Sequence, residues 1–206
     1  LTTAQVQQEA YSELAVPSNF ATIQQAVNNA SDGDTITVSY GYYPETVVVN
    51  KSVTMNGVNL PWVTGGGFSL YSNGTTLNGF VLPITPGGIT VYSSNNTIEN
   101  NNVYGVIQIS SPASNNLIIG NNLTYTTQDG IRVSYSSNNT ILSNTVSSKG
   151  ASGIYVQNSP NTTIRSNTIR YNGQSGGDNS GIGIDYSDNC TIAYNTITNN
   201  GFAGIR

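Results

Sequence analysis

The chain has 206 residues, a formal net charge of −4 and no histidine. Its six lysine and arginine residues are scattered along the sequence and form no stripe for phosphates, which argues against nucleic acid as a partner. Charged residues make up only 8% of the chain, so solubility must come from amides and hydroxyls. No run of residues is long and apolar enough to span a membrane, and nothing in the composition indicates a metal or a cofactor.

The first predicted element is a helical arm at residues 1–16. Residues 2–14 place apolar side chains on one helical face, and Thr2 and Gln5 have the spacing of a capping box. Pro17 ends this helix, because the residue before a proline is driven out of the α region. We expect the arm to pack on the first coil. The alternatives are that it frays or docks on a neighbouring copy.

A second helix is predicted at about residues 20–30, and coils are predicted from about 34 to 206. Ile23, Ala26 and Val27 fall on one face of this helix, which suits it to cover the end of an apolar stack. The Asp32-Gly33-Asp34 turn and Glu45 invite a catalytic reading, but they are better interpreted as residues that close a turn and a coil.

Four segments in this region resemble the opening of right-handed parallel β-helix proteins, which include pectin methylesterases and NosD-type surface proteins. The segments are Phe20–Val27, Asp32–Val38, Gly41–Val49 and Lys51–Gly57. The resemblance, extended by the repeats described below, covers roughly residues 18–206. It implies a helix that caps the first coil, and it is informative about fold rather than activity.

Residues 57–71 are glycine-rich and are predicted to form the first outward loop. Trp62, the only tryptophan, follows a proline there. It is a candidate to stack on a sugar ring or to contact a neighbouring subunit. A tryptophan folded back on its own coil is the alternative.

From residue 94 onward one sequence motif occurs five times. Its anchors, 20 to 28 residues apart, are Thr97, Leu117, Thr140, Thr163 and Thr191. An isoleucine follows each anchor, at Ile98, Ile118, Ile141, Ile164 and Ile192. An asparagine lies four residues after each anchor, at Asn101, Asn121, Asn144, Asn167 and Asn195. Another lies two residues before each anchor, at Asn95, Asn115, Asn138, Asn161 and Asn189.

Such copies hold too few apolar residues to make a core alone, so they must stack. The sequence therefore predicts an all-β, single-domain right-handed parallel β-helix of about seven or eight coils. Equivalent positions would stack about 4.8 Å apart, so both asparagine columns are expected to form inward ladders of hydrogen-bonded amides.

Few residues of the repeat region are candidates for a role in catalysis. Asp129 with Arg132 is the nearest local pair, and Asp185 is expected in one column with Ser134 and Gln157. The histidine of polygalacturonase-type hydrolases, the characteristic segments of pectin methylesterases and the acids of a calcium cage are absent. We therefore predict no enzymatic activity.

Eight sequons occur, and four of them fall in the column expected to face inward. The better candidates for glycosylation are Asn29, Asn50, Asn73 and Asn122. Abundant asparagine, threonine and tyrosine with little charge predict an extracellular or cell-surface setting. The chain begins without a signal peptide, so we expect a mature or trimmed form.

The function predicted from these features is a non-catalytic structural subunit of a cell-surface filament, sheath or layer, which assembles head to tail. A carbohydrate-binding surface solenoid and, less favoured, a polysaccharide lyase or esterase are the alternatives. Gly204, Ile205 and Arg206 open a strand that has no cap and form the candidate assembly surface. Either the chain is cut from a longer protein, or the arm at residues 1–16 of another copy covers this end.

Overall fold

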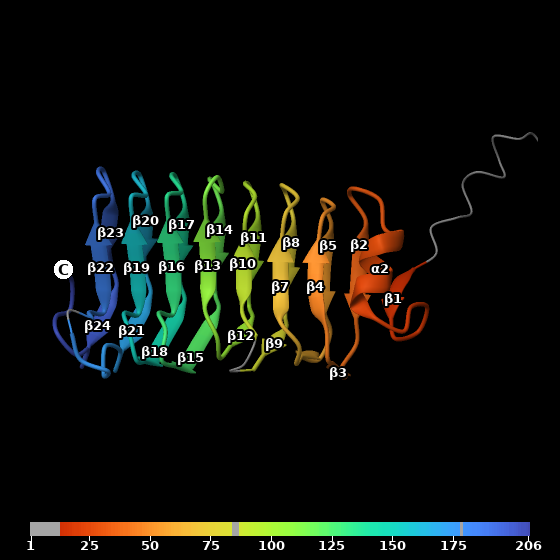
Figure 1. Ribbon diagram of the computed structural model, residues 1–206, viewed down its shortest axis with the longest axis horizontal. Coiled ribbons are helices and arrows are strands. Elements are labelled where there is room, and N and C mark those ends of the chain that lie inside the picture. Colours follow the sequence, from red (N-terminus) through yellow and green to blue (C-terminus); the bar gives the residue numbers. More distant parts are fainter. Residues whose placement is uncertain (1–12, 84–86, 178) are drawn as a thin grey trace, which may run out of the picture.

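The computed structural model describes residues 13–83, 87–177 and 179–206. In these ranges the chain winds into coils, and equivalent strands of successive coils lie side by side (Figure 1). The strands pair in parallel into three sheets, of nine, eight and seven strands, which we call sheets A, B and C. A chain whose strands pair only with the coils before and after it is a parallel β-helix, as the sequence predicted.

Sheet A consists of β1 (Leu14–Val16), β2 (Thr35–Val38), β5 (Thr54–Gly57), β8 (Thr76–Asn78), β11 (Thr97–Glu99), β14 (Leu117–Ile119), β17 (Thr140–Leu142), β20 (Thr163–Arg165) and β23 (Thr191–Ala193). Sheet B consists of β3 (Tyr42–Tyr43), β6 (Trp62–Val63), β9 (Val81–Leu82), β12 (Asn102–Val103), β15 (Asn122–Thr126), β18 (Thr145–Lys149), β21 (Thr168–Arg170) and β24 (Thr196–Thr198). Sheet C consists of β4 (Thr46–Val49), β7 (Gly67–Leu70), β10 (Ile89–Val91), β13 (Ile107–Ser110), β16 (Ile131–Ser134), β19 (Ile154–Gln157) and β22 (Ile182–Asp185).

Seven coils therefore contribute a strand to all three sheets, and an eighth contributes β23, β24 and an isolated bridge between Ile205 and Ile182. This agrees with the predicted number of coils. The repeat isoleucines pair in register from Ile98 to Ile192, so the predicted inward stack is confirmed. Alternate residues of each strand point into one continuous apolar core, as period-two strands require.

One helix, α2 (Ile23–Asn29), is present in the described ranges, and it covers the N-terminal end of the stack (Figure 1). Its apolar face is buried, as the sequence predicted, through Ile23, Ala26 and Val27. The Glu45 carboxylate accepts hydrogen bonds of 2.9 Å from the backbone N–H groups of Ile23 and Gln24. Glu45 thus satisfies free donors at the helix N-terminus, which agrees with a structural rather than a catalytic interpretation.

The predicted helical arm needs correction at its end. Residues 1–12 lie outside the described residues, so most of the predicted helix is not described. Leu14–Val16, however, form strand β1, which pairs with β2 and is buried. Three successive apolar residues next to the unpaired edge of β2 bury more surface as a strand of sheet A than as a helical turn.

Asparagines four residues after each anchor form a buried ladder. The Nδ2 atoms of Asn101, Asn121, Asn144 and Asn167 each donate to the Oδ1 atom of the next asparagine, over 2.9–3.1 Å. The same oxygens accept the backbone N–H of the preceding coil's asparagine. This ladder holds the short turn between sheets A and B.

The second predicted ladder is placed one residue too early. All five asparagines of this column, Asn95, Asn115, Asn138, Asn161 and Asn189, are exposed, and all but Asn115 begin a sequon. Their φ angles of 56° to 61° put them in the left-handed turn that enters sheet A. The following residue faces inward instead, and the Nδ2 atom of Asn96 donates to Asn116 Oδ1 at 2.9 Å. An asparagine supplies the positive φ of the turn at low cost, which turns its side chain outward. Burial therefore does not exclude these four sequons from glycosylation.

Residues 57–71 do not form an outward loop. They contain strands β6 and β7, and Trp62 lies in β6, half-buried on the outer face of sheet B. Its ring packs against Tyr42 with centroids 5.8 Å apart. The glycines there allow close passage of neighbouring coils rather than a loop, since a Cβ on Gly57 would approach the backbone of Gly79.

Candidate functional site

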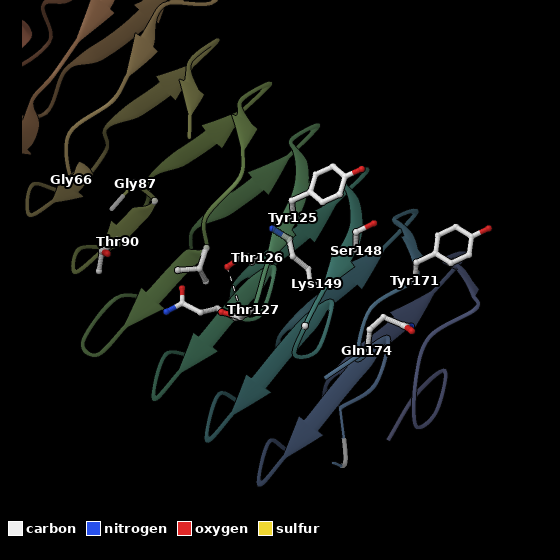
Figure 2. Close-up of a pocket in the computed structure, with 14 residues that line it drawn as sticks. Gly66, Gly87, Thr90, Tyr125, Thr126, Thr127, Ser148, Lys149, Tyr171 and Gln174 are labelled. Atoms are coloured by element: carbon white, nitrogen blue, oxygen red, sulfur yellow. Dashed lines mark hydrogen bonds between the residues drawn. The ribbon is translucent and has the colours of Figure 1, made fainter. Parts of the chain in front are cut away.

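A groove of about 1080 Å³ opens where the strands of sheet B end and those of sheet C begin (Figure 2). Its lining comes from several coils, from Gly66 to Gln174. Gly66, Gly87 and Gly88 line one end, where a Cβ on Gly88 would lie 2.8 Å from the carbonyl oxygen of Val106. Glycine therefore keeps side chains out of this part of the groove.

Tyr125, Ser148 and Tyr171 form one wall of the groove. They occupy the same register position in three successive coils, because β15, β18 and β21 pair residue for residue around them. All three have positive φ angles, of 48°, 56° and 57°. Figure 2 shows both tyrosine rings and the serine pointing the same way from the ribbon, and the tyrosines are 61% and 49% exposed.

Lys149 lies at the base of this wall and is fully buried. Its Nζ atom donates to the carbonyl oxygens of Gly105 at 3.0 Å and Thr124 at 3.2 Å. Burial lowers the pKa of Lys149 from its usual 10.5 to about 7. The lysine ties the turns of three coils together beneath the groove and places a positive charge there below about pH 7.

The groove continues along the helix through two smaller sections. Val106, Thr127 and Gln128 line both the main groove and a section of about 450 Å³ that reaches Asp129 and Arg132. The same aspartate and arginine line the third section, of about 140 Å³, together with Tyr155 and Arg206. The shared residues place the three sections next to one another, and we refer to them together as the path.

Asp129 and Arg132 form an ion pair at the centre of this path. The Arg132 Nε and Nη2 atoms lie 2.8 and 2.6 Å from Asp129 Oδ2, while Oδ1 accepts the backbone N–H of Ser152 at 2.9 Å. Burial raises the pKa of Asp129, and Arg132 and the Ser152 N–H oppose that rise. The aspartate is buried, whereas Arg132 remains 41% exposed and faces the groove.

Tyr155 and Asp185 follow on the next coils. The Tyr155 hydroxyl donates to Asp185 Oδ2 at 2.5 Å, and Arg206 Nη2 lies 3.4 Å from the same oxygen. The Arg132 guanidinium carbon lies 5.0 Å from the centre of the Tyr155 ring. Burial raises the pKa of Tyr155, and the hydrogen bond to Asp185 adds to the effect. The group combines an exposed cation with a hydroxyl that can pass a proton to a carboxylate.

Of the residues singled out in the sequence, Asp129, Arg132 and Asp185 come together at this site. The register also confirms the expected column of Ser134, Gln157 and Asp185. Trp62 does not line the groove, and the candidate glycosylation sites Asn29, Asn50, Asn73 and Asn122 are exposed elsewhere. Gly204, Ile205 and Arg206 extend next to β22, where Arg206 exchanges backbone hydrogen bonds with Ile182 and Ile184.

Four residues that line the site were not predicted from the sequence: Tyr125, Lys149, Tyr155 and Tyr171. A signal for two of them existed, because Tyr125 and Tyr171 lie eight residues after their anchors, as Ser148 and Asn199 do. In the described parts of the chain, no cluster of three or more histidine, cysteine, aspartate or glutamate side chains could hold a metal ion. Nor does any helix there have the length and apolar character needed to cross a membrane.

A family model described as a right handed beta helix region matches residues 47–206. The chain belongs to this right-handed β-helix family. The match confirms the predicted family and the handedness of the coils. A comparison with the sequences of curated proteins finds no significant match.

Two solved structures share the β-helix. An alginate lyase from Paenibacillus sp. str. FPU-7 superposes with a TM-score of 0.72 at 17% identity, over 84% of this chain and 72% of the lyase. The enzymatically active domain of Bacteriophage CBA120 tailspike protein 2 gives a TM-score of 0.68 at 16% identity. That match covers 88% of this chain and 33% of the tailspike chain.

The predicted non-catalytic filament subunit is wrong in view of these structures, which are a lyase and an enzymatically active domain. The prediction of no activity rested on the missing motifs of three other enzyme families. One β-helix can carry several arrangements of reactive groups, so the absence of those motifs does not exclude another site. Nothing in the comparisons supports head-to-tail assembly.

Proposed function

We propose that this β-helix is an extracellular polysaccharide-active enzyme that cleaves a chain containing uronic acids. The observation that carries the proposal is that the tyrosine-walled groove adjoins sections lined by Arg132 and by Tyr155, whose hydroxyl is hydrogen-bonded to Asp185. The fold shared with an alginate lyase supports the same reaction class.

The main groove is suited to a sugar chain. Tyrosine rings offer faces for sugar rings, while the threonine, serine and glutamine side chains of the lining offer hydrogen bonds to hydroxyls. No carboxylate is among the described residues that line it, whereas Lys149 lies at its base. The groove therefore accepts a negatively charged chain without repulsion from an acidic side chain, although the whole protein is acidic.

Arg132, Tyr155 and Asp185 supply groups for β-elimination. Arg132 pairs with the uronate carboxylate and stabilises the negative charge that builds on it. The Tyr155 oxygen takes the proton from C5 of the sugar while its own proton passes to Asp185, along the existing hydrogen bond. The C5–H electron pair becomes the C4–C5 double bond, the bond from C4 to the glycosidic oxygen breaks, and that oxygen takes a proton from water.

Incubation with alginate and polygalacturonate is expected to generate unsaturated sugar ends, measured by their ultraviolet absorbance. Arg132→Gln should lower kcat/KM by about 100-fold or more, because it removes the cation opposite the developing charge. The matched control is Arg165→Gln. Arg165 also lies over a tyrosine ring, 4.6 Å from the centre of Tyr194, but on sheet A away from the groove, so this change should leave the rate unaltered.

Equal loss of activity in both arginine variants would contradict the proposal. Binding without any product would favour the second candidate, a carbohydrate-binding β-helix. The main groove favours that candidate, because its lining offers tyrosine rings and hydroxyls for a sugar chain but no carboxylate that could act as an acid or a base.

An extracellular setting also gives a role to the exposed sequons. Asn29, Asn50, Asn73 and Asn122 are the proposed glycosylation sites, and peptide mass spectrometry of the native protein tests each of them. Trp62, packed on Tyr42, stays a proposed second contact for a sugar ring.

A further inference from the structure

The wall of the main groove alternates between aromatic and small polar side chains from coil to coil. The positions are Tyr125, Ser148 and Tyr171, all with positive φ and all eight residues after their anchors. Asn199 has the same offset and a positive φ on the next coil, but it does not line the groove. The two tyrosines thus lie two coils apart. Since adjacent strands lie about 4.8 Å apart, two coils separate the tyrosine positions by about 10 Å along the helix axis.

We infer that Tyr125 and Tyr171 are stacking platforms for alternate sugar rings of one polysaccharide chain that runs along the helix axis. The inference rests on the proposed function and names the shape of its substrate. In a flat 1,4-linked chain with equatorial linkages, each sugar is turned over relative to the last, so every second ring presents the same face to one side. The advance per sugar in such a chain is close to the spacing of one coil.

The geometry of the wall fits this arrangement. Both rings point the same way in Figure 2 and are about half exposed or more, so their faces are available. Ser148, between them, leaves room for the sugar ring that is turned over and offers a hydroxyl to it. A buckled chain with axial linkages turns its ring faces away from one flat side and advances less per sugar, so it matches the two tyrosines less well.

The test compares two fractions of alginate, one rich in mannuronate and one rich in guluronate. Their sugars differ only in the configuration at C5, but the first chain is flat and the second is buckled. Affinity electrophoresis through gels that contain each fraction measures Kd directly. The unmodified protein is expected to bind the mannuronate-rich fraction more tightly, and either Tyr125→Asn or Tyr171→Asn should weaken that binding about tenfold.

Asparagine is the appropriate replacement because Asn199 occupies the equivalent position of the repeat with a φ of 53°. The change therefore removes the ring without straining the turn. Matched controls are Tyr135→Asn and Tyr186→Asn. These tyrosines are also exposed, have φ of 54° and 49° and lie two coils apart, but they follow β16 and β22 and do not line the groove.

Unchanged affinity in both groove variants, or tighter binding to the guluronate-rich fraction, would overturn the stacking model while the proposed function stands. If the protein binds and cleaves neither alginate nor polygalacturonate, the proposed function and the stacking model both fail.

Discussion

Asn144→Leu is expected to lower the free energy of unfolding by about 3–5 kcal/mol, because it opens the middle of the buried ladder. Asn144 Oδ1 accepts the backbone N–H and the side-chain Nδ2 of Asn121 at 2.9 and 3.0 Å. Its Nδ2 donates to the Ile118 carbonyl at 2.9 Å and to Asn167 Oδ1 at 3.1 Å. Leucine has a similar size but leaves buried donors and acceptors on both neighbouring coils without partners.

Urea denaturation followed by circular dichroism measures this effect. The control is Asn122→Leu, at the exposed first residue of β15, whose Nδ2 makes a long 3.5 Å contact with Asn102. That change should alter stability by no more than about 0.5 kcal/mol. If Asn144→Leu proves as mild as the control, the buried ladder contributes little to the stability of the fold. Because stacked repeats can unfold in stages, separate transitions for the two halves would also locate the damage.

The second large effect expected is a pH dependence of stability that comes from Lys149. Its folded-state pKa of about 7 lies below the usual 10.5, so the unfolded chain binds a proton more readily than the folded protein between these values. Stability therefore rises with pH across this window. The burial penalty is present in full below about pH 7 and is progressively removed towards pH 10.5. The shift corresponds to roughly 4–5 kcal/mol between the two limits.

Lys149→Met isolates this contribution, because methionine fills a similar space without a charge. As pH rises from 7 to 10, the free energy of unfolding of the unmodified protein should increase relative to that of the variant. The difference between the two proteins is the quantity to follow, since tyrosines titrate in both. A constant difference across this range would show that Lys149 is not desolvated in the folded protein. The variant also leaves the carbonyls of Gly105 and Thr124 without this donor, which lowers its stability by a constant amount at every pH.

The repeat offsets by themselves predict the fold. Ile98 and its counterparts had to face inward, because each copy has too few apolar residues to form a core alone. The same offsets correctly paired Ser134, Gln157 and Asp185 on one column. These features could be read from the sequence because in a solenoid the register between neighbours follows directly from the repeat.

Two local features could not be read in this way. Whether Asn95 or Asn96 faces inward depends on which residue adopts positive φ at the turn, and asparagine suits both positions. Leu14–Val16 form a strand because the edge of β2 lies beside them, a contact that local helical periodicity does not contain. In both cases the local turn or the neighbouring strand decided the conformation, and the sequence pattern did not.

The sequence by itself determined the β-helix, its approximate number of coils and its inward isoleucine stack, because these follow from a period repeated along the chain. Only the tertiary structure decided the groove. Tyr125 and Tyr171 are 46 positions apart in the sequence, and Arg132 and Asp185 are 53 apart. The coil winding brings such residues within a few strand spacings of one another, and the turns between sheets B and C leave an open path between them. That path depends on turn geometry, on glycines that exclude side chains and on one buried lysine, none of which the repeat period specifies.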